Sequence, residues 1–184
     1  MIKVRVLEKK NIGLKFYIPL KHLVLLSVAG TVISLDQLTK HLVIQRFRLG
    51  ETLPIIENYF SFTHVHNPGA AFGILSAWDS SLRTPFFLIV PLVALVLITF
   101  IFRKIEEKDL KLSSALSLII GGAIGNLIDR AAYGYVIDFL DFHWTIRGPH
   151  FPAFNIADAA ICVGVALLIL DTFKKERKNV SDSI

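Results

Sequence analysis

Aspartate, asparagine and basic side chains that could carry out acid–base chemistry gather beside the ends of long apolar segments of this 184-residue chain. They occur in three groups, in each of which the first member lies three or four positions before the others: Asp36 with Lys40, Asn126 with Asp129 and Arg130, and Asn155 with Asp158. Such spacings place side chains on one face of a helix. An ionisable group within a membrane span costs about 2.5–3.5 kcal/mol, so these groups indicate a functional or paired site.

Two carboxylates that are held close together cannot both ionise easily, so one of them keeps a proton. Such a pair can activate water as a base and polarise a carbonyl group as an acid. Asp138 and Asp141 lie in the connection that leads back to Asp158. The residues alone allow either Asp129 or Asp138 as the partner of Asp158.

Long apolar segments must position these groups. Hydrophobic residues make up 53% of the chain, and its mean hydropathy of +0.58 is too high for an ordinary soluble domain. A bilayer core requires about 20 apolar residues per helix, and four segments approach this length: 18–38, 85–102, 112–132 and 156–173. The sequence therefore predicts one integral-membrane domain of the all-α class, with four transmembrane helices and a disordered cytoplasmic tail after about residue 174.

The distribution of basic residues predicts the orientation of these helices. Fourteen of the 20 Lys and Arg residues lie in the N-terminal region, the 103–111 loop and the C-terminal tail, whereas six lie on the other side. By the positive-inside rule both termini are cytoplasmic. The polar ends of the first, third and fourth spans then meet at the outer face. No cleavage site follows residues 20–35, so we expect the first span to be retained.

The connection after the first span contains, between Leu53 and His66, a segment that mostly alternates in polarity: Tyr59-Phe60-Ser61-Phe62-Thr63-His64-Val65-His66. This alternation predicts a short strand pair, or cradle, on the outer surface. The turn-forming residues that begin at Asn67 interrupt it.

Other functions are less well supported. His64, His66, His143 and His150 lack the spacing of a catalytic zinc site, and Cys162 is the single cysteine, so no metal and no cofactor are expected. The net charge of +5 follows the membrane topology and does not indicate nucleic acid. A proton-coupled transporter would use similar groups, but four spans without an inverted repeat do not favour a carrier. A purely structural membrane protein would not need this cluster of ionisable residues.

Five motifs occur in a fixed order along nearly the whole chain: Asp36-Gln37-Leu38-Thr39-Lys40, Asn67-Pro68-Gly69-Ala70-Ala71-Phe72, Gly121-Gly122-Ala123-Ile124-Gly125-Asn126-Leu127-Ile128-Asp129-Arg130, Val136-Ile137-Asp138-Phe139 and Phe154-Asn155-Ile156-Ala157-Asp158. In this order the chain resembles the lipoprotein signal peptidases, also called signal peptidase II or aspartyl peptidase family A8.

The resemblance implies a four-helix bundle with a small extracytoplasmic β-cradle and a surface-lying helix. It implies a metal-free catalytic pair of Asp138 and Asp158, supported by seven residues: Asp36, Lys40, Asn67, Asn126, Asp129, Arg130 and Asn155. The implied activity is cleavage of diacylglyceryl-modified prolipoproteins just before the lipidated cysteine, at the outer face of the bacterial inner membrane. The implied partners are these substrates, membrane lipid and inhibitors of the globomycin type.

Overall fold

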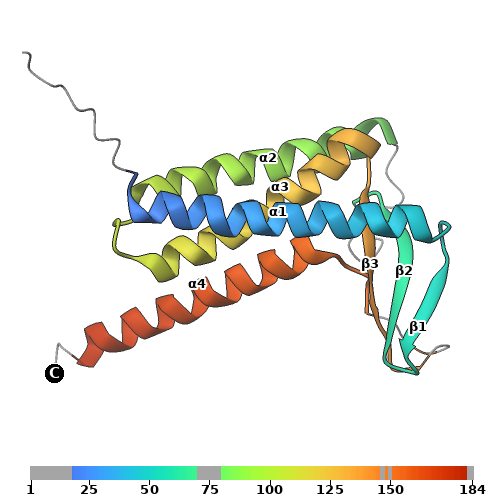
Figure 1. The fold of residues 1–184 in the computed structure, drawn as a ribbon. Coiled ribbons are helices and arrows are strands. Elements are labelled where there is room, and N and C mark those ends of the chain that lie inside the picture. Colours follow the sequence, from blue (N-terminus) through green and yellow to red (C-terminus); the bar gives the residue numbers. More distant parts are fainter. Residues whose placement is uncertain (1–17, 70–79, 146–147, 149–150, 182–184) are drawn as a thin grey trace, which may run out of the picture.

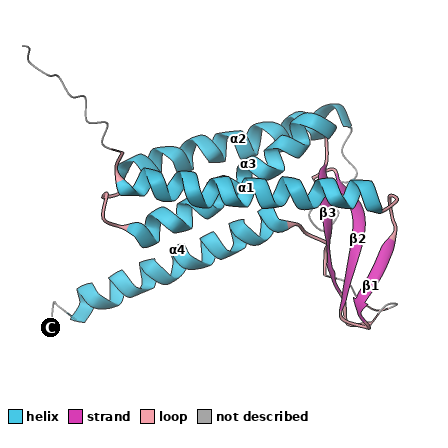
Figure 2. Cartoon of the chain, in the orientation of Figure 1, coloured by secondary structure: helices cyan, strands magenta, loops and turns pink. Residues whose placement is uncertain are grey.

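The fold is a bundle of four long helices with a small sheet at one end (Figures 1 and 2). The computed structural model describes residues 18–69, 80–145, 148 and 151–181. Its elements in chain order are α1 (Leu20–Arg46), β1 (Thr52–Ile56), β2 (Phe60–Asn67), α2 (Ser80–Lys104), α3 (Leu110–Tyr133), β3 (Val136–Phe142) and α4 (Ile156–Ser181). We call the end of the bundle beside the strands the sheet end.

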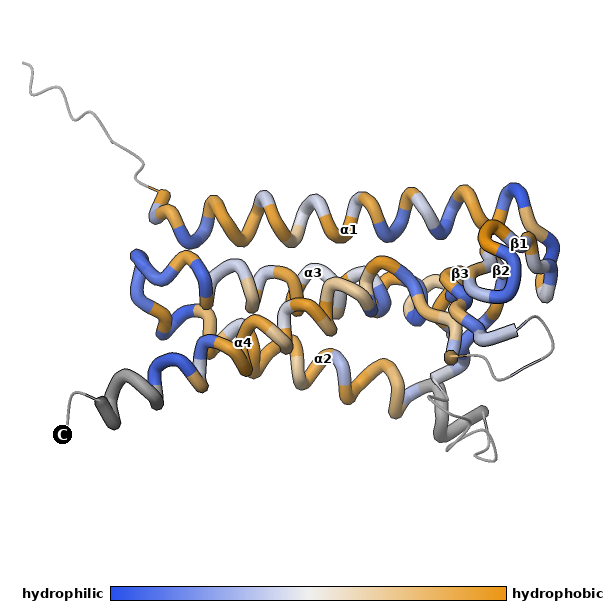
Figure 3. The backbone as a smooth tube through the Cα atoms, turned by 90° about the horizontal axis from the view of Figure 1, so that it is seen from below, coloured by the Kyte–Doolittle hydropathy of each residue, from blue (hydrophilic) through white to orange (hydrophobic). Residues whose placement is uncertain are grey.

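All four helices are long and apolar enough to cross a membrane. Figure 3 shows that their hydrophobic residues lie along the middle of the bundle, with hydrophilic residues concentrated at its two ends. The many large apolar side chains exposed on α1, α2 and α4 are suited to contact with lipid tails. The predicted class, four membrane-spanning helices with a small sheet, is confirmed.

Two helices extend beyond the predicted segments. α1 continues to Arg46 rather than ending near Leu38, because the polar residues after that point do not break a helix. α4 is helical to Ser181, where a disordered tail after about residue 174 was expected. Lys175 stabilises this extension through ion pairs with Asp171 at 2.7 Å and Asp109 at 3.1 Å.

α3 is the central helix, and its small residues bring the neighbouring helices close. A Cβ atom added at Gly121 would lie 2.9 Å from the backbone of Ala29 on α1, and one added at Gly122 would clash with the carbonyl oxygen of Ala157 on α4. Close approach of helices through small residues is typical of membrane bundles. α1 and α4 are therefore both held against α3 near the polar motifs.

The sheet has the order β1-β2-β3, and both pairs of strands are antiparallel. The β1–β2 pair is the predicted strand pair, and Asn58 occupies a positive φ of 65° in its turn. The sequence patterns did not reveal β3, which pairs with β2 so that Asn67 lies opposite Val136. α3 ends at Gly134 in the left-handed region, and this turn directs the chain into β3.

The segment before α4 adds to the same sheet. The backbone N–H of Leu140 donates to the carbonyl oxygen of Phe154 at 2.8 Å, and that of Phe154 donates to the carbonyl oxygen of Leu140 at 3.1 Å. This bridge fixes the start of α4 beside β3. The surface-lying helix is not among the helices of the described ranges, and Ala70–Phe72 of the second motif and Trp78 lie outside them.

Replacement of Gly122 by Ala should destabilise the bundle, because the new methyl group meets a backbone carbonyl that cannot move aside. We expect a loss of about 1–3 kcal/mol. Gly30→Ala is the matched control, since nothing lies within 4 Å of a Cβ atom at that position of α1. Thermal unfolding of both variants in detergent measures the difference. Equal melting temperatures would contradict the close contact between α3 and α4.

Candidate active site

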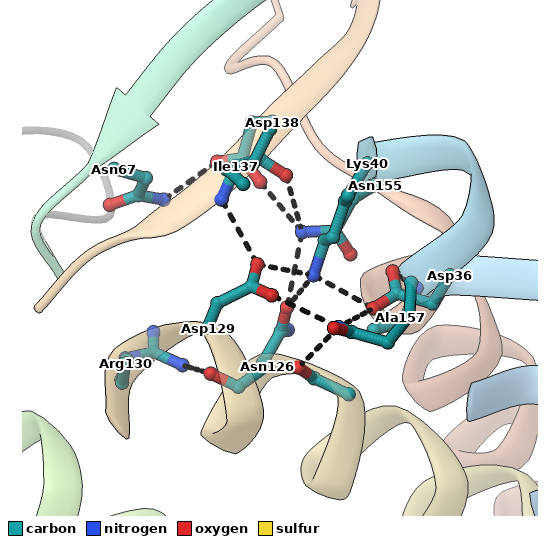
Figure 4. A network of polar contacts seen from close by, with 12 residues as sticks. Asp36, Lys40, Asn67, Asn126, Asp129, Arg130, Ile137, Asp138, Asn155 and Ala157 are labelled. Atoms are coloured by element: carbon teal, nitrogen blue, oxygen red, sulfur yellow. Dashed lines mark hydrogen bonds and ion pairs between the residues drawn. The ribbon is translucent and has the colours of Figure 1, made fainter. Parts of the chain in front are cut away.

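A buried lysine lies at the centre of a polar network at the sheet end (Figure 4). The Nζ atom of Lys40 lies 2.8 Å from Asp36 Oδ2 and 2.7 Å from Asp129 Oδ2. It also donates a hydrogen bond to Asn126 Oδ1 at 3.0 Å. All four side chains are almost completely buried. Opposite charges compensate one another here, as burial of ionised groups requires.

The two aspartates of this network also bind backbone N–H groups of other elements. Asp36 Oδ1 accepts from Ala157 N in the first turn of α4 at 2.9 Å. Asp129 Oδ2 accepts from Ile137 N on β3 at 3.2 Å. The network therefore connects α1 and α3 to the two elements that carry Asp138 and Asp158.

Asp158 is held by a capping box at the start of α4. Asn155 Oδ1 accepts a hydrogen bond from Asp158 N at 2.9 Å, and Asp158 Oδ2 accepts one from Asn155 N at 3.3 Å. Asn126 Nδ2 donates to the other carboxylate oxygen of Asp158 at 2.7 Å. These three hydrogen bonds fix the position of the Asp158 carboxyl group in the first turn of α4.

Asp138 projects from β3 toward the same point. Its Oδ1 accepts from Asn155 Nδ2 at 2.7 Å, and its Oδ2 accepts from Asn67 Nδ2 on β2 at 2.9 Å. Burial and, to a smaller extent, the negative charge of Asp158 raise the pKa of Asp138 to about 7. The two amide donors and Lys40 oppose this shift. The raised pKa of Asp138 favours retention of a proton on this carboxyl group near neutral pH, as an acid that acts on a carbonyl requires.

The structure brings together the residues predicted for the site, but Arg130 lies at its margin. Among the described residues, Arg130 Nη1 donates to the carbonyl oxygen of Asn126, at 3.3 Å, and its guanidinium lies 5.9 Å from the Phe87 ring centroid. Gln37 was not predicted, although it donates to Asp129 Oδ1 at 3.0 Å and to the carbonyl oxygen of Gly125 at 3.2 Å. The helical spacing of Asp36 and Lys40 did not single out Gln37, because its contacts are with residues of α3 that are far away in the sequence.

Asp141 and the histidines lie apart from this network. Asp141 is opposite Ser61 in the sheet, and Ser61 Oγ lies 2.9 Å from His143 Nε2. His64 Nδ1 contacts the carbonyl oxygen of Phe47, and His66 stacks on Tyr135. Among the residues that the structure describes, no three His, Cys, Asp or Glu side chains form a group that could hold a metal ion. His150 lies outside the described residues.

The family model of signal peptidase (SPase) II matches residues 28–174. A lipoprotein signal peptidase of Syntrophotalea carbinolica is 48% identical over 80% of this chain and 89% of its own length. One of Geobacter metallireducens is 47% identical over 85% of this chain and 94% of its own. A third, of Haemophilus influenzae strain Rd, is 41% identical over 84% of this chain and 88% of its own length.

Solved structures agree with these sequence relatives. A bacterial membrane enzyme determined by the in meso method at 2.3 Å resolution has a TM-score of 0.72 and 35% identity, covering 83% of this chain and 88% of its own. A second, at 1.9 Å resolution, has a TM-score of 0.71 and covers 82% of this chain and 92% of its own. The fold and the similarities define a multi-pass membrane peptidase of the aspartic type. The chain belongs to the signal peptidase II family, whose members remove the signal peptides of lipoproteins.

The raised pKa of Asp138 predicts the pH dependence of cleavage. A raised carboxyl pKa keeps the proton up to about pH 7, so a step that needs this proton should slow as the pH rises through that value. Asn67→Ala removes a hydrogen bond that lowers the pKa, and the alkaline limb should move to higher pH. Cleavage rates of both proteins from pH 5 to 9 measure the limb. Movement to lower pH would contradict the assignment of the proton to Asp138.

Proposed function

We propose that Asp138 and Asp158 are the catalytic pair with which this chain cleaves diacylglyceryl-modified prolipoproteins before the lipidated cysteine. The observation that carries the proposal is that Asn155 binds both carboxyl groups, through its side chain and its backbone N–H. The alternative pair of Asp129 and Asp158 is disfavoured, because Asp129 already binds Lys40, Gln37 and the backbone of β3.

The proposed reaction needs one water molecule and the two carboxyl groups. Ionised Asp158 removes a proton from the water, whose oxygen attacks the scissile carbonyl carbon, while protonated Asp138 gives its proton to the carbonyl oxygen. Asp158 then passes its proton to the leaving nitrogen and Asp138 recovers its own from the intermediate. The C–N bond breaks and yields a carboxyl group on the signal peptide and a free amino group on the cysteine. Each aspartate returns to its starting state.

The remaining polar residues support this pair. Asn67, Asn126 and Asn155 orient the carboxyl groups by hydrogen bonds. Asp36, Lys40 and Asp129 join the helices on which the pair depends. Arg130, at the margin, has a buried Nε atom with no hydrogen-bond partner in the part of the chain that the structure describes, and it is suited to hold the substrate backbone.

The membrane brings the substrate to this site. Each buried CH₂ group contributes about 0.8 kcal/mol to membrane anchoring, so two acyl chains retain the substrate in the bilayer and it arrives by lateral diffusion. The scissile bond must then lie near the lipid–water interface. Asp158 lies in the first turn of α4 and Asp138 lies on the sheet beside it, so the proposed pair is at the depth of this interface. We assign the sheet end to the outer face of the inner membrane. The proposed mechanism involves no metal ion. We also expect that globomycin inhibits the enzyme.

Asp138→Asn and Asp158→Asn should each lower cleavage of a purified lipidated prolipoprotein by roughly 10²–10⁴-fold, because each removes a proton donor or acceptor while keeping its size. The double variant should be scarcely worse than either single variant, since the two groups act as one unit. Gel separation of precursor and product measures the rates.

Asp171→Asn is the matched control, because Asp171 lies at the opposite end of the bundle and pairs only with Lys175 in the described structure. It should retain the full rate. An active Asp138→Asn variant beside an inactive, well-folded Asp129→Asn variant would instead assign catalysis to Asp129 and Asp158.

The charge distribution predicts that both termini are cytoplasmic. Reporter fusions after residue 184 and near Asn67 should therefore give opposite readouts with a pair of compartment-specific enzymes. The same readout at both positions would refute the proposed orientation of the four spans.

A further inference from the structure

A cavity lies between the last turns of α1 and the sheet, apart from the proposed catalytic pair. Its volume is about 550 Å³, within the range of roughly 300–1,000 Å³ that is typical of small-molecule sites. Its lining is mainly apolar and includes Leu42, Val43, Leu53, Ile55, Phe62 and Phe139. The site is therefore suited to a hydrocarbon chain.

β3 separates this cavity from the proposed catalytic pair. Neighbouring side chains of a strand point to opposite faces. Phe139 lines the cavity and packs near Val43 of α1, whereas Asp138 binds Asn67 and Asn155 on the other face. A peptide bond held at the pair therefore does not enter the cavity, which leaves the cavity accessible to a different ligand.

Two arginines lie at the rim of the cavity. Arg46 lines it, and Arg46 and Arg48 together line the adjoining open depression. Both side chains are exposed, and neither forms an ion pair within the described part of the chain. Glu51 also lines both the cavity and the depression, and its Oε2 atom accepts from the backbone N–H of Arg48 at 2.7 Å, so two guanidinium groups stand against one carboxylate here. The two guanidinium groups remain available for a phosphate, which arginine binds well.

The length of α1 places these arginines at the depth of lipid headgroups. A helix of 27 residues is about 40 Å long, whereas the hydrocarbon core of a bilayer is about 30 Å thick. Arg46 is the last residue of α1, and Leu42 lies one turn closer to the hydrocarbon. Apolar β1 residues beside the cavity are exposed, among them Leu53 and Ile55.

We propose that this cavity binds an anionic phospholipid from the leaflet at the sheet end. One acyl chain fills the apolar cavity, and Arg46 and Arg48 bind the phosphate. The charge of the rim favours this occupant over the diacylglyceryl group of a substrate, which has no phosphate. A lipid in this position fills the space between α1 and the sheet that carries Asp138.

Photolabelling tests the proposal. The probe is phosphatidylglycerol with a diazirine at the end of one acyl chain, added to the full chain in dodecyl maltoside micelles. Mass spectrometry should find adducts within residues 39–47 and 52–62. Arg46→Gln and Arg48→Gln should each reduce this labelling by roughly 5-fold, because a basic residue near a lipid surface contributes about that factor to anion attraction. Both arginine side chains are exposed, so neither substitution should impair folding.

Three controls decide the outcome. Lys104→Gln, which removes an exposed charge at the opposite end of the bundle, should label like the unmodified protein. Diacylglycerol with the same diazirine chain should label the cavity weakly. Asp138→Asn should label normally, so the result is independent of the proposed catalytic pair. Equal labelling by diacylglycerol, or unchanged labelling of both arginine variants, would overturn the proposal in favour of a purely apolar occupant.

Discussion

The architecture of the sheet end depends on the ammonium group of Lys40, which is buried between the carboxylates of Asp36 and Asp129. Removal of this cation would leave two buried carboxylates without a charged partner in the described network, and a buried charge without a partner is strongly destabilising. The compensation is completed by uncharged donors, since Gln37 and two backbone N–H groups satisfy the remaining carboxylate oxygens. The ammonium group of Lys40 thus compensates the charges of both buried carboxylates. Asp36 in turn binds the start of α4, and Asp129 binds the start of β3.

This arrangement requires α1, α3 and α4 to lie unusually close together. Gly125 has no side chain where a Cβ atom would lie 2.7 Å from Asp36 Oδ2, and Gly122 leaves room for the backbone of α4. The small residues of α3 therefore do more than let helices pack. They provide the space in which Asp36 reaches across to Ala157, and they link the packing of the membrane bundle to the geometry of the polar site.

The sheet and the bundle contribute different parts of the proposed mechanism. The bundle holds Asp158 in a capping box at the start of α4, where Asn126 and Asn155 bind its carboxyl group. The sheet holds Asp138 in a buried position, where its pKa rises to about 7. Two chemically identical side chains can therefore take opposite roles because their supports differ. If a phospholipid fills the cavity behind β3, the surrounding membrane becomes part of the support for Asp138.

Sequence patterns were sufficient for the four helices, because length and apolar composition decide whether a segment crosses a bilayer. Spacing also placed Asp36 with Lys40 and Asn155 with Asp158, since helical periodicity is local. The residues alone left Asp129 and Asp138 as alternatives, because Asp129 lies near the end of α3 and Asp138 follows that helix closely in the chain. Our proposal of Asp138 rests on the family resemblance and on the contacts that already occupy Asp129. Only the structure paired β3 with β2, joined Phe154 to Leu140 and gave Gln37 its contacts with Asp129 and Gly125. These are contacts between residues far apart in sequence, and their geometry depends on how closely the helices approach through α3.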